Sequence, residues 1–156
     1  MSNSLDPNDP AIVPEPVYTP PVIPLHGFLG LELEPAGDGP PIGEASVTMR
    51  IEPDTIGANG NPHGGAIATM VDVSCALAAV RASAFDPQTQ SLVTTDLHVR
   101  YLGKPRTDSV SSKARVVRAG STLIVVSAEV ADSNGHLVAV ADASMMIVAL
   151  RRPAPT

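Results

Sequence analysis

Aromatic side chains are almost missing from this sequence, which has no tryptophan and an aromatic content of 3% over 156 residues. The walls of any pocket would therefore be mostly alanine, valine, methionine and leucine, which accept aliphatic and aryl groups alike. Cysteine is equally scarce, because Cys75 is the only one. It cannot form an internal disulfide, and in its apolar run a cysteine usually acts as a small hydrophobe. We therefore expect a reducing compartment, the cytoplasm.

Positive charge is also in short supply. Ten lysines and arginines against 16 acids give a net charge of -6 and a pI near 5.0. This balance argues against nucleic acid as a partner, since binding it needs clustered cations that displace counterions. The four histidines do not have the spacing of metal ligands: they are His26, His63, His98 and His136. A Gly-x-Ser-x-Gly motif is absent as well, so we expect neither a metal site nor a serine triad.

The first 24 residues differ from the rest of the chain. Seven prolines fall between Pro7 and Pro24, and the segment lacks the basic start and continuous apolar core of a signal peptide. We expect a flexible, proline-rich tail over residues 1–24, one folded domain over 25–150 and a short tail over 151–156. The chain length and a hydrophobic content of 44% suit one domain with a substantial core.

The longest apolar run extends from Gly64 to Val80 and could be mistaken for a membrane span. Its length is at the short limit for spanning, it is rich in alanine, and the charge of Asp72 at its centre would be costly in lipid. A buried helix in a protein without a membrane partner is the better interpretation. We expect this helix to begin at Gly64 and to end near Phe85, because Pro87 stops it.

Alternation with period two predicts strands on both sides of this helix. The clearest case is the segment 44–52, which follows an expected strand over Phe28–Leu33 and a turn over 35–43, and which leads into a loop over 53–62. Four more strands are expected within residues 91–102, 109–118, 122–131 and 136–150. One long apolar helix among antiparallel strands predicts an α+β domain in which a curved sheet wraps the helix.

The expected strand over 91–102 alternates without a break. Val93, Thr95 and Leu97 fall on one face of this strand, whereas Thr94 and Asp96 fall on the other.

On the helix, Asp72 shares its face only with small side chains. They are Gly65, Ala68, Thr69, Cys75, Ala76 and Ala79. Bulkier side chains on the opposite face would anchor the helix to the sheet, so the small face leaves room for a second helix, a subunit or a ligand. Taken alone, Asp72 is better explained as a buried or interface acid that hydrogen bonds satisfy, because a buried charge needs partners.

The triplet His63-Gly64-Gly65 at the helix start favours a functional role for this acid. Glycines there expose backbone N–H groups, and the helix dipole makes the terminus receptive to developing negative charge. An acid two turns further along is placed to activate a water, or to attack a carbonyl held at that terminus. Without the acid, His63 would be read as a cap or a packing residue.

Three stretches carry a resemblance to a known family. They are "NPHGGAIATMVD", "TTDLHVRYLGKP" and "ARVVRAGSTLIVVSAEVADSNGHLVAVADASMMIV". Together they resemble the hotdog-fold acyl-CoA thioesterases, most closely the phenylacetate-pathway type among the relatives of 4-hydroxybenzoyl-CoA thioesterase. The resemblance covers residues 25–150. It implies a hotdog fold, acyl-CoA as the substrate with no further cofactor, and homodimers or homotetramers with active sites at the dimer interface.

The resemblance also implies roles for individual residues. Asp72 corresponds to the family acid, which acts as general base or nucleophile, and the Gly64 N–H would polarise the thioester carbonyl. His63 would help to shape the carbonyl site, and Gly65 and Thr69 would contact the substrate. The acid of one subunit would face the glycine of its partner.

Two positions depart from the family pattern. Gly57 stands where many relatives carry an Asn or Gln, and Ala76 stands where they often carry a Ser or Thr. Asn59 or Asn61 would replace the missing amide if the loop is reshaped. These departures motivate an alternative function, a hotdog protein that binds acyl-CoA without hydrolysing it. A hydratase is a weaker third hypothesis, because "HGGAIATMVD" does not look like the hydratases of this fold.

Recognition of coenzyme A phosphates needs cations near the surface. The candidates lie in two turns, and each is equally well explained as a solvated surface residue. They are Lys104 and Arg106 in the first turn, and Arg118 with Gly120 and Ser121 in the second.

Overall fold

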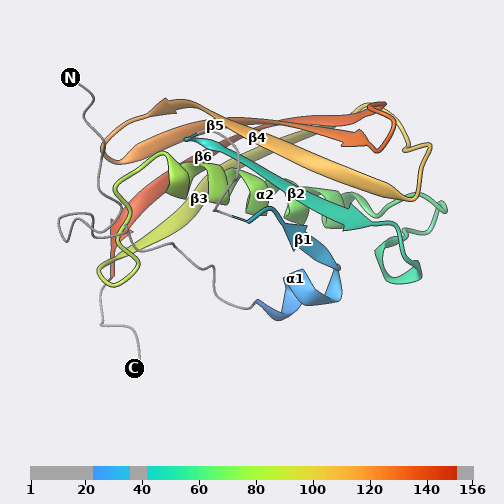
Figure 1. The fold of residues 1–156 in the computed structure, drawn as a ribbon, viewed down its shortest axis with the longest axis horizontal. Helices are drawn as coiled ribbons and strands as arrows, with labels where there is room; N and C mark the ends of the chain where they lie inside the picture. The colour runs from blue at the N-terminus through green and yellow to red at the C-terminus, as the bar shows by residue number, and fades with distance from the viewer. Residues whose placement is uncertain (1–22, 36–41, 151–156) are drawn as a thin grey trace, which may run out of the picture.

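A six-stranded antiparallel sheet curls around one long helix in the computed structural model, which describes residues 23–35 and 42–150 (Figure 1). The strands are β1 (Leu31–Leu33), β2 (Glu44–Arg50), β3 (Gln90–Tyr101), β4 (Ser109–Ala119), β5 (Leu123–Asp132) and β6 (Leu137–Ala149). Their order across the sheet is β1-β2-β4-β5-β6-β3. The predicted α+β architecture is confirmed. The predicted tails lie almost wholly outside the described residues and stay predictions.

Helix α2, Gly64–Arg81, fills the concave side of the sheet (Figure 1). Its length and its mean hydropathy of 1.3 would also suit a membrane span, but here the sheet covers its bulky face. Met70, Val71 and Ala78 are fully buried against the inward residues of β2, β4 and β5. The burial of this apolar surface is the main stabilising contribution to the domain.

A pair of buried hydroxyls fixes α2 against the sheet. The Ser74 hydroxyl donates to the Val71 carbonyl at 2.9 Å, and its oxygen lies 2.7 Å from the hydroxyl of Ser112 on β4. Both serines are inaccessible to solvent. Because a buried hydroxyl without a partner is costly, this pair favours one placement of the helix on β4.

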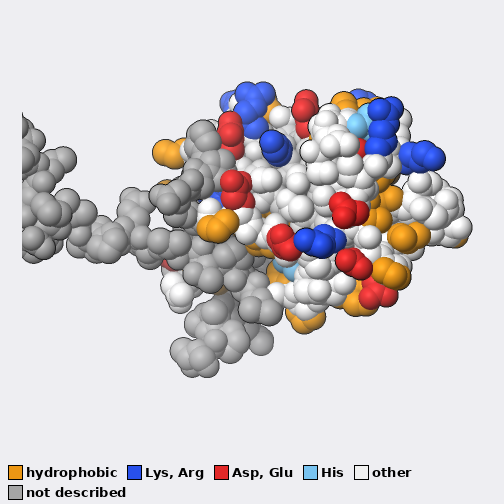
Figure 2. Space-filling model, turned by 45° about the vertical axis from the view of Figure 1, so that its right-hand side comes forward, with side chains coloured by type: hydrophobic (Ala, Val, Ile, Leu, Met, Phe, Trp, Pro, Cys, Tyr) orange, Lys and Arg blue, Asp and Glu red, His pale blue; other side chains and the backbone are white. Residues whose placement is uncertain are grey.

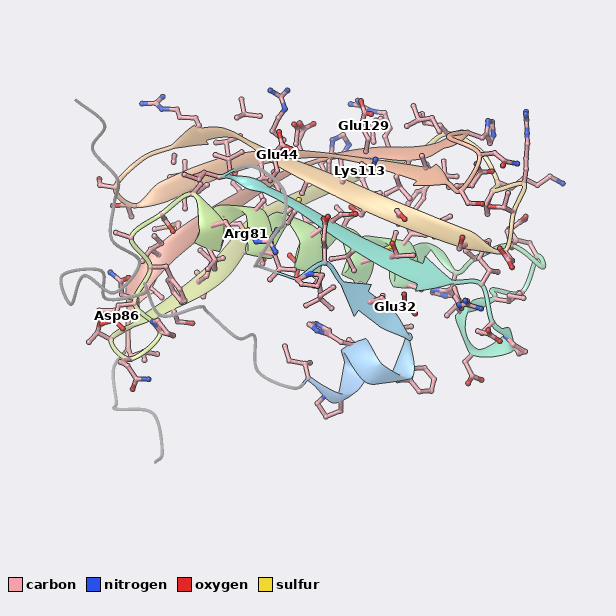
Figure 3. All side chains as sticks on the ribbon, in the orientation of Figure 1. Glu32, Glu44, Arg81, Asp86, Lys113 and Glu129 are labelled. Atoms are coloured by element: carbon pink, nitrogen blue, oxygen red, sulfur yellow. The ribbon has the colours of Figure 1, made fainter. Side chains whose placement is uncertain are left out.

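The end of α2 comes one turn earlier than predicted. The helix ends at Arg81 rather than near Phe85, because the Ser83 hydroxyl donates to the Ala79 carbonyl at 2.9 Å and satisfies one of the terminal acceptors. Arg81 donates to the carbonyls of Glu44 and Glu34 at 3.0 and 2.9 Å, and Figure 3 shows it between α2 and the first two strands. The guanidinium thus ties the helix end to β1 and β2.

The expected first strand was wrong in its N-terminal half. A short helix, α1 (Pro24–Phe28), precedes β1, which begins only at Leu31. Pro24 suits the first turn of a helix because its φ is fixed and it has no N–H to satisfy. Gly30 then reverses the chain with a φ of 59°, a conformation that side chains with Cβ rarely adopt.

The outer face of the sheet carries the polar half of each alternating strand. In β2, Ala45, Val47 and Met49 are buried, which fits the alternation of the segment 44–52. On the outer side Lys113 of β4 lies opposite Glu129 of β5, and Figure 3 shows both pointing away from α2. Figure 2 shows basic and acidic side chains interspersed over one face of the molecule. That face therefore has no broad basic surface of the kind that nucleic acids bind.

Candidate active site

The start of α2 is capped by its own N-cap residue. The Nδ1 atom of His63 accepts a hydrogen bond from the Gly65 N–H at 2.9 Å, and the His63 carbonyl accepts from the N–H groups of Ala66 and Ile67. Within the described residues, the N–H of Gly64 has no acceptor. Of the first four helix donors, Gly64 is therefore the one left to receive negative charge from a ligand.

Tyr101 packs against Gly64 and borders one side of the helix start. Its hydroxyl donates to the Gly64 carbonyl at 2.7 Å, and a Cβ on Gly64 would lie 3.4 Å from the phenol. Tyr101 ends the edge strand β3 and is half exposed. Partial burial raises the pKa of the Tyr101 phenol above its ordinary value, so the hydroxyl keeps its proton at neutral pH.

Asp72 lies two turns along the helix and is held by a second residue of β3. The Thr94 hydroxyl donates to Oδ1 of Asp72 at 2.7 Å, a distance typical of a hydrogen bond to a carboxylate. Asp72 is half-buried, so part of its side chain is open to solvent. Asp72 therefore has a fixed orientation and access to solvent.

The predicted faces of β3 were wrong around Thr94. The pairing of β3 with β6 shifts register between Thr94 and Asp96, so Thr95 is an extra residue in a β-bulge. Its hydroxyl donates to the carbonyl of Ser144 on β6 at 3.0 Å. The bulge turns Thr94 toward the helix, where Leu97 also packs beyond the bulge. This irregularity explains why strict alternation missed Thr94.

The face of α2 that carries small side chains is accessible to solvent, except at two of the predicted positions, Cys75 and Ala79. Gly65, Ala68, Thr69, Asp72 and Ala76 remain exposed or half-buried. Thr69 donates its hydroxyl back to the Gly65 carbonyl at 2.9 Å, as a helical threonine commonly does.

Cys75 and Ala79 belong to the core instead, because both are completely buried. Burial, reinforced by the nearby Asp72 charge, raises the pKa of the Cys75 thiol to about 12. The thiol therefore stays protonated, and its burial confirms the expectation that Cys75 acts as a small hydrophobe of the core.

Within one protomer, Gly64 and Asp72 lie far apart along α2. Eight residues of α-helix separate them, which is about 12 Å along the axis. An attacking water and an oxyanion donor must both lie within roughly 3 Å of the reacting carbonyl group. Within one chain the two groups are therefore too far apart to contact the same carbonyl group.

The loop before α2 uses its amides internally. Asn59 Oδ1 accepts from the Asn61 N–H at 3.2 Å, and Asn61 Nδ2 donates to the Asn59 carbonyl at 3.4 Å. Gly57 packs beside His63, since a Cβ on Gly57 would lie 3.5 Å from the His63 ring. A side chain at position 57 would therefore contact the capping histidine.

The candidate phosphate-binding residues fall into two groups at opposite ends of β4. Lys104 and Arg106 precede β4, and Arg118, Gly120 and Ser121 lie at or beyond its end. All five are exposed. An 11-residue strand is about 35 Å long, so one protomer cannot use both groups on one phosphate cluster. Lys104 and Arg106 lie at the end where α2 begins, because they come three and five residues after Tyr101, which contacts Gly64.

Asp132 fixes the loop that carries Lys104 and Arg106. Its carboxylate accepts hydrogen bonds from the backbone N–H groups of Arg106, His136 and Asn134 at 2.8, 2.9 and 3.0 Å. These donors, led by that of Arg106, hold the pKa of Asp132 below its usual range. The two loops at this end of the sheet are therefore linked through one carboxylate. Among the described residues, no group of His, Cys, Asp or Glu side chains is arranged to hold a metal ion.

The curled sheet around a single central helix defines the class of protein as a hotdog fold. The chain belongs to the thioesterase superfamily, whose family model matches residues 59–139, a span that includes Gly64, Asp72, Thr94 and Tyr101. Membership makes thioester hydrolysis the general class of reaction, and it confirms the resemblance found in the sequence.

Individual relatives agree with this assignment. A Halobacterium salinarum protein named "putative esterase" is 34% identical over 134 residues, 79% of this chain and 83% of that protein. A Bacillus halodurans protein solved with CoA has a TM-score of 0.73 at 25% identity and covers 83% of this chain and 82% of its own. The Escherichia coli PaaI protein from the phenylacetic acid degradation operon has the same fold, with a TM-score of 0.69 at 17% identity over 81% of this chain and 85% of that chain.

Proposed function

We propose that this protein hydrolyses acyl-CoA thioesters to a free acid and CoA in the cytoplasm. The observation that carries the proposal is the pair of groups on α2, an N–H at Gly64 without an acceptor in the described residues and a carboxylate at Asp72 oriented by Thr94. The first can stabilise an oxyanion and the second can take a proton from water. The CoA bound in the Bacillus halodurans relative supports the choice of thioester.

The reaction follows from these two groups. The thioester carbonyl oxygen accepts a hydrogen bond from the Gly64 N–H, which polarises the carbonyl. Asp72 removes a proton from a water as the water oxygen bonds to the carbonyl carbon, and the resulting oxyanion stays on the N–H. Collapse of this intermediate breaks the C–S bond and releases the CoA thiolate, which the proton on Asp72 can neutralise.

The site is completed by a second copy of the chain. The distance of about 12 Å between Gly64 and Asp72 along one helix supports a site in which the Asp72 of one protomer works with the Gly64 of its partner. Strand β3 offers the surface for this pairing, because it is a 12-residue edge strand with one side unpaired by the other described strands. Pairing of two such edges about a two-fold axis makes a dimer, and dimers of dimers can form from it.

Coenzyme A phosphates would lie near Lys104 and Arg106. This group stands at the same end of the sheet as Gly64, and the Asp132 carboxylate holds its loop in one position. A thioester whose carbonyl lies at Gly64 would extend its nucleotide over this end. His63, Gly65 and Thr69 would then line the carbonyl site.

The test is an Asp72→Asn variant assayed against short, long and aromatic acyl-CoAs. We expect loss of turnover with the oligomer and the CoA-ester affinity retained, because the amide keeps the shape but cannot accept the proton. Asp142→Asn is the matched control, since Asp142 is an exposed acid on the outer face of β6. Unchanged hydrolysis by Asp72→Asn across the panel would refute the proposal.

A second candidate function is the binding of acyl-CoA without hydrolysis. Gly57 replaces the amide that many relatives carry, and the side-chain amides of Asn59 and Asn61 each bond the backbone of the other residue. Measurable affinity for acyl-CoA together with no product at high protein concentration would favour this alternative.

A further inference from the structure

Tyr101 stands out because it contacts the start of α2 yet has no role in the reaction described above. Tyr101 is half exposed at the C-terminal end of β3, and its hydroxyl donates to the Gly64 carbonyl at 2.7 Å. The phenol also lies within van der Waals reach of where a side chain on Gly64 would be. Its contacts thus fall on the residue that presents the unpaired N–H.

The backbone of Gly64 needs such a restraint. Glycine has more conformational freedom than other residues, and Gly64 and Gly65 are consecutive at a helix start where the intrahelical hydrogen bonds are incomplete. On the Gly65 side the His63 ring supplies a restraint, because Nδ1 accepts from the Gly65 N–H. The Tyr101 hydroxyl of β3 restrains the other end of the same peptide unit, because the Gly64 carbonyl and the Gly65 N–H belong to one planar peptide.

We propose that Tyr101 is a positioning residue: it fixes the Gly64–Gly65 peptide and, through the φ and ψ angles of Gly64, the direction of the Gly64 N–H that meets the developing oxyanion. The inference rests on the proposed function, because it assigns Tyr101 to the same carbonyl site. An oxyanion donor contributes most when it is already oriented before the reaction, so a mobile donor lowers the rate without weakening the binding of the ground state.

The informative variant is Tyr101→Phe, which keeps the ring and removes the hydroxyl. One neutral hydrogen bond corresponds to a fall of about fivefold to tenfold in kcat, and we expect KM for the acyl-CoA to stay within twofold. Ser83→Ala is the matched control, because it also removes a hydroxyl that donates to a backbone carbonyl of α2, that of Ala79 at the other end of the helix. We expect the control to keep the wild-type kcat.

Two further measurements separate positioning from general stability. Amide hydrogen exchange of a peptide covering residues 63–68 should become faster in Tyr101→Phe, with the rest of α2 unchanged. Replacement of Tyr101 by p-aminophenylalanine restores a donor on the same ring and should recover most of kcat. This replacement also serves if the phenylalanine variant does not fold.

The outcomes distinguish this inference from the function on which it rests. Wild-type protein without any thioester hydrolysis would overturn both. An active wild type that loses turnover in Asp72→Asn, together with an unchanged kcat in Tyr101→Phe, would overturn the role of Tyr101 alone. A raised KM at constant kcat would do the same, because Tyr101 would then bind the substrate instead of orienting the donor.

Discussion

The hydrogen bond from Thr94 to Asp72 gives a direct test of how the carboxylate is oriented. Thr94→Val replaces the hydroxyl by a methyl group of nearly the same size, so it removes the 2.7 Å contact and keeps the β-branched shape that suits a strand. A hydrogen bond to a charged group contributes about 1.5–3 kcal/mol. Asp72 is half-buried, and water replaces part of the lost bond, so we expect a cost of about 1–2 kcal/mol.

In rate terms this cost is a fall of roughly fivefold to thirtyfold in kcat. The assay is steady-state hydrolysis of an acyl-CoA with thiol detection, combined with a thermal melt of each variant. Thr94→Ser, which retains the hydroxyl, should stay within about threefold of wild type. Wild-type kcat in Thr94→Val, at an unchanged melting temperature, would refute the view that Thr94 orients the carboxylate.

Three other predictions concern the loop, the phosphate site and acid stability. Gly57→Asn should raise kcat/KM severalfold over a Gly57→Ala control in the same assay, because it restores the amide that many relatives carry. A side chain fits at this position, since Gly57 has no positive φ and an added Cβ would lie 3.5 Å from the His63 ring, an ordinary contact distance. An unchanged or lower kcat/KM would contradict this prediction. The double variant Lys104→Ala/Arg106→Ala should raise KM for an acyl-CoA about threefold to tenfold. KM for the matching acyl-pantetheine, which lacks the nucleotide, should not change. An equal rise for both thioesters, or the same effect from Arg118→Ala, would contradict the placement of the CoA phosphates at Lys104 and Arg106. The lowered pKa of Asp132 means that its stabilising contribution is present above about pH 4, the ordinary range of an aspartate, and is lost as the pH falls through the folded pKa. Asp132→Ala should therefore lower the melting temperature more at pH 7 than at pH 3, and an equal loss at both pH values would contradict the assignment.

The fold was predictable because its signals are local. Alternation in β2 and the long alanine-rich run of α2 follow from neighbouring residues, and Asp72 and Gly64 were found from their spacing on that run. The end of α2 was placed too late, because the hydroxyl of Ser83 supplies an early cap that Pro87 does not signal.

Thr94 and Tyr101 were missed as site residues for a different reason. Thr94 contacts Asp72, which is 22 residues away in the sequence, and Tyr101 contacts Gly64, which is 37 residues away. Both contacts depend on where β3 lies against α2. The bulge at Thr95 reverses the face of Thr94, and a single extra residue in one strand has no signature in the alternation itself. The stretch "TTDLHVRYL" contained both residues, but only the tertiary pairing with β6 selects their direction.

The place of β3 in the sheet has a consequence for synthesis of the protein. β4, β5 and β6 follow one another as hairpins, whereas β3 pairs only with β6 among the described strands, so Gln90 meets Ala149 and Tyr101 meets Ala139. Such distant pairing closes late, because the chain entropy of the intervening loop opposes it. On a ribosome, α2 therefore emerges with its acid and its glycines long before the strand that orients them can settle. A prematurely terminated chain that lacks β6 would carry Asp72 and Gly64 but no working site.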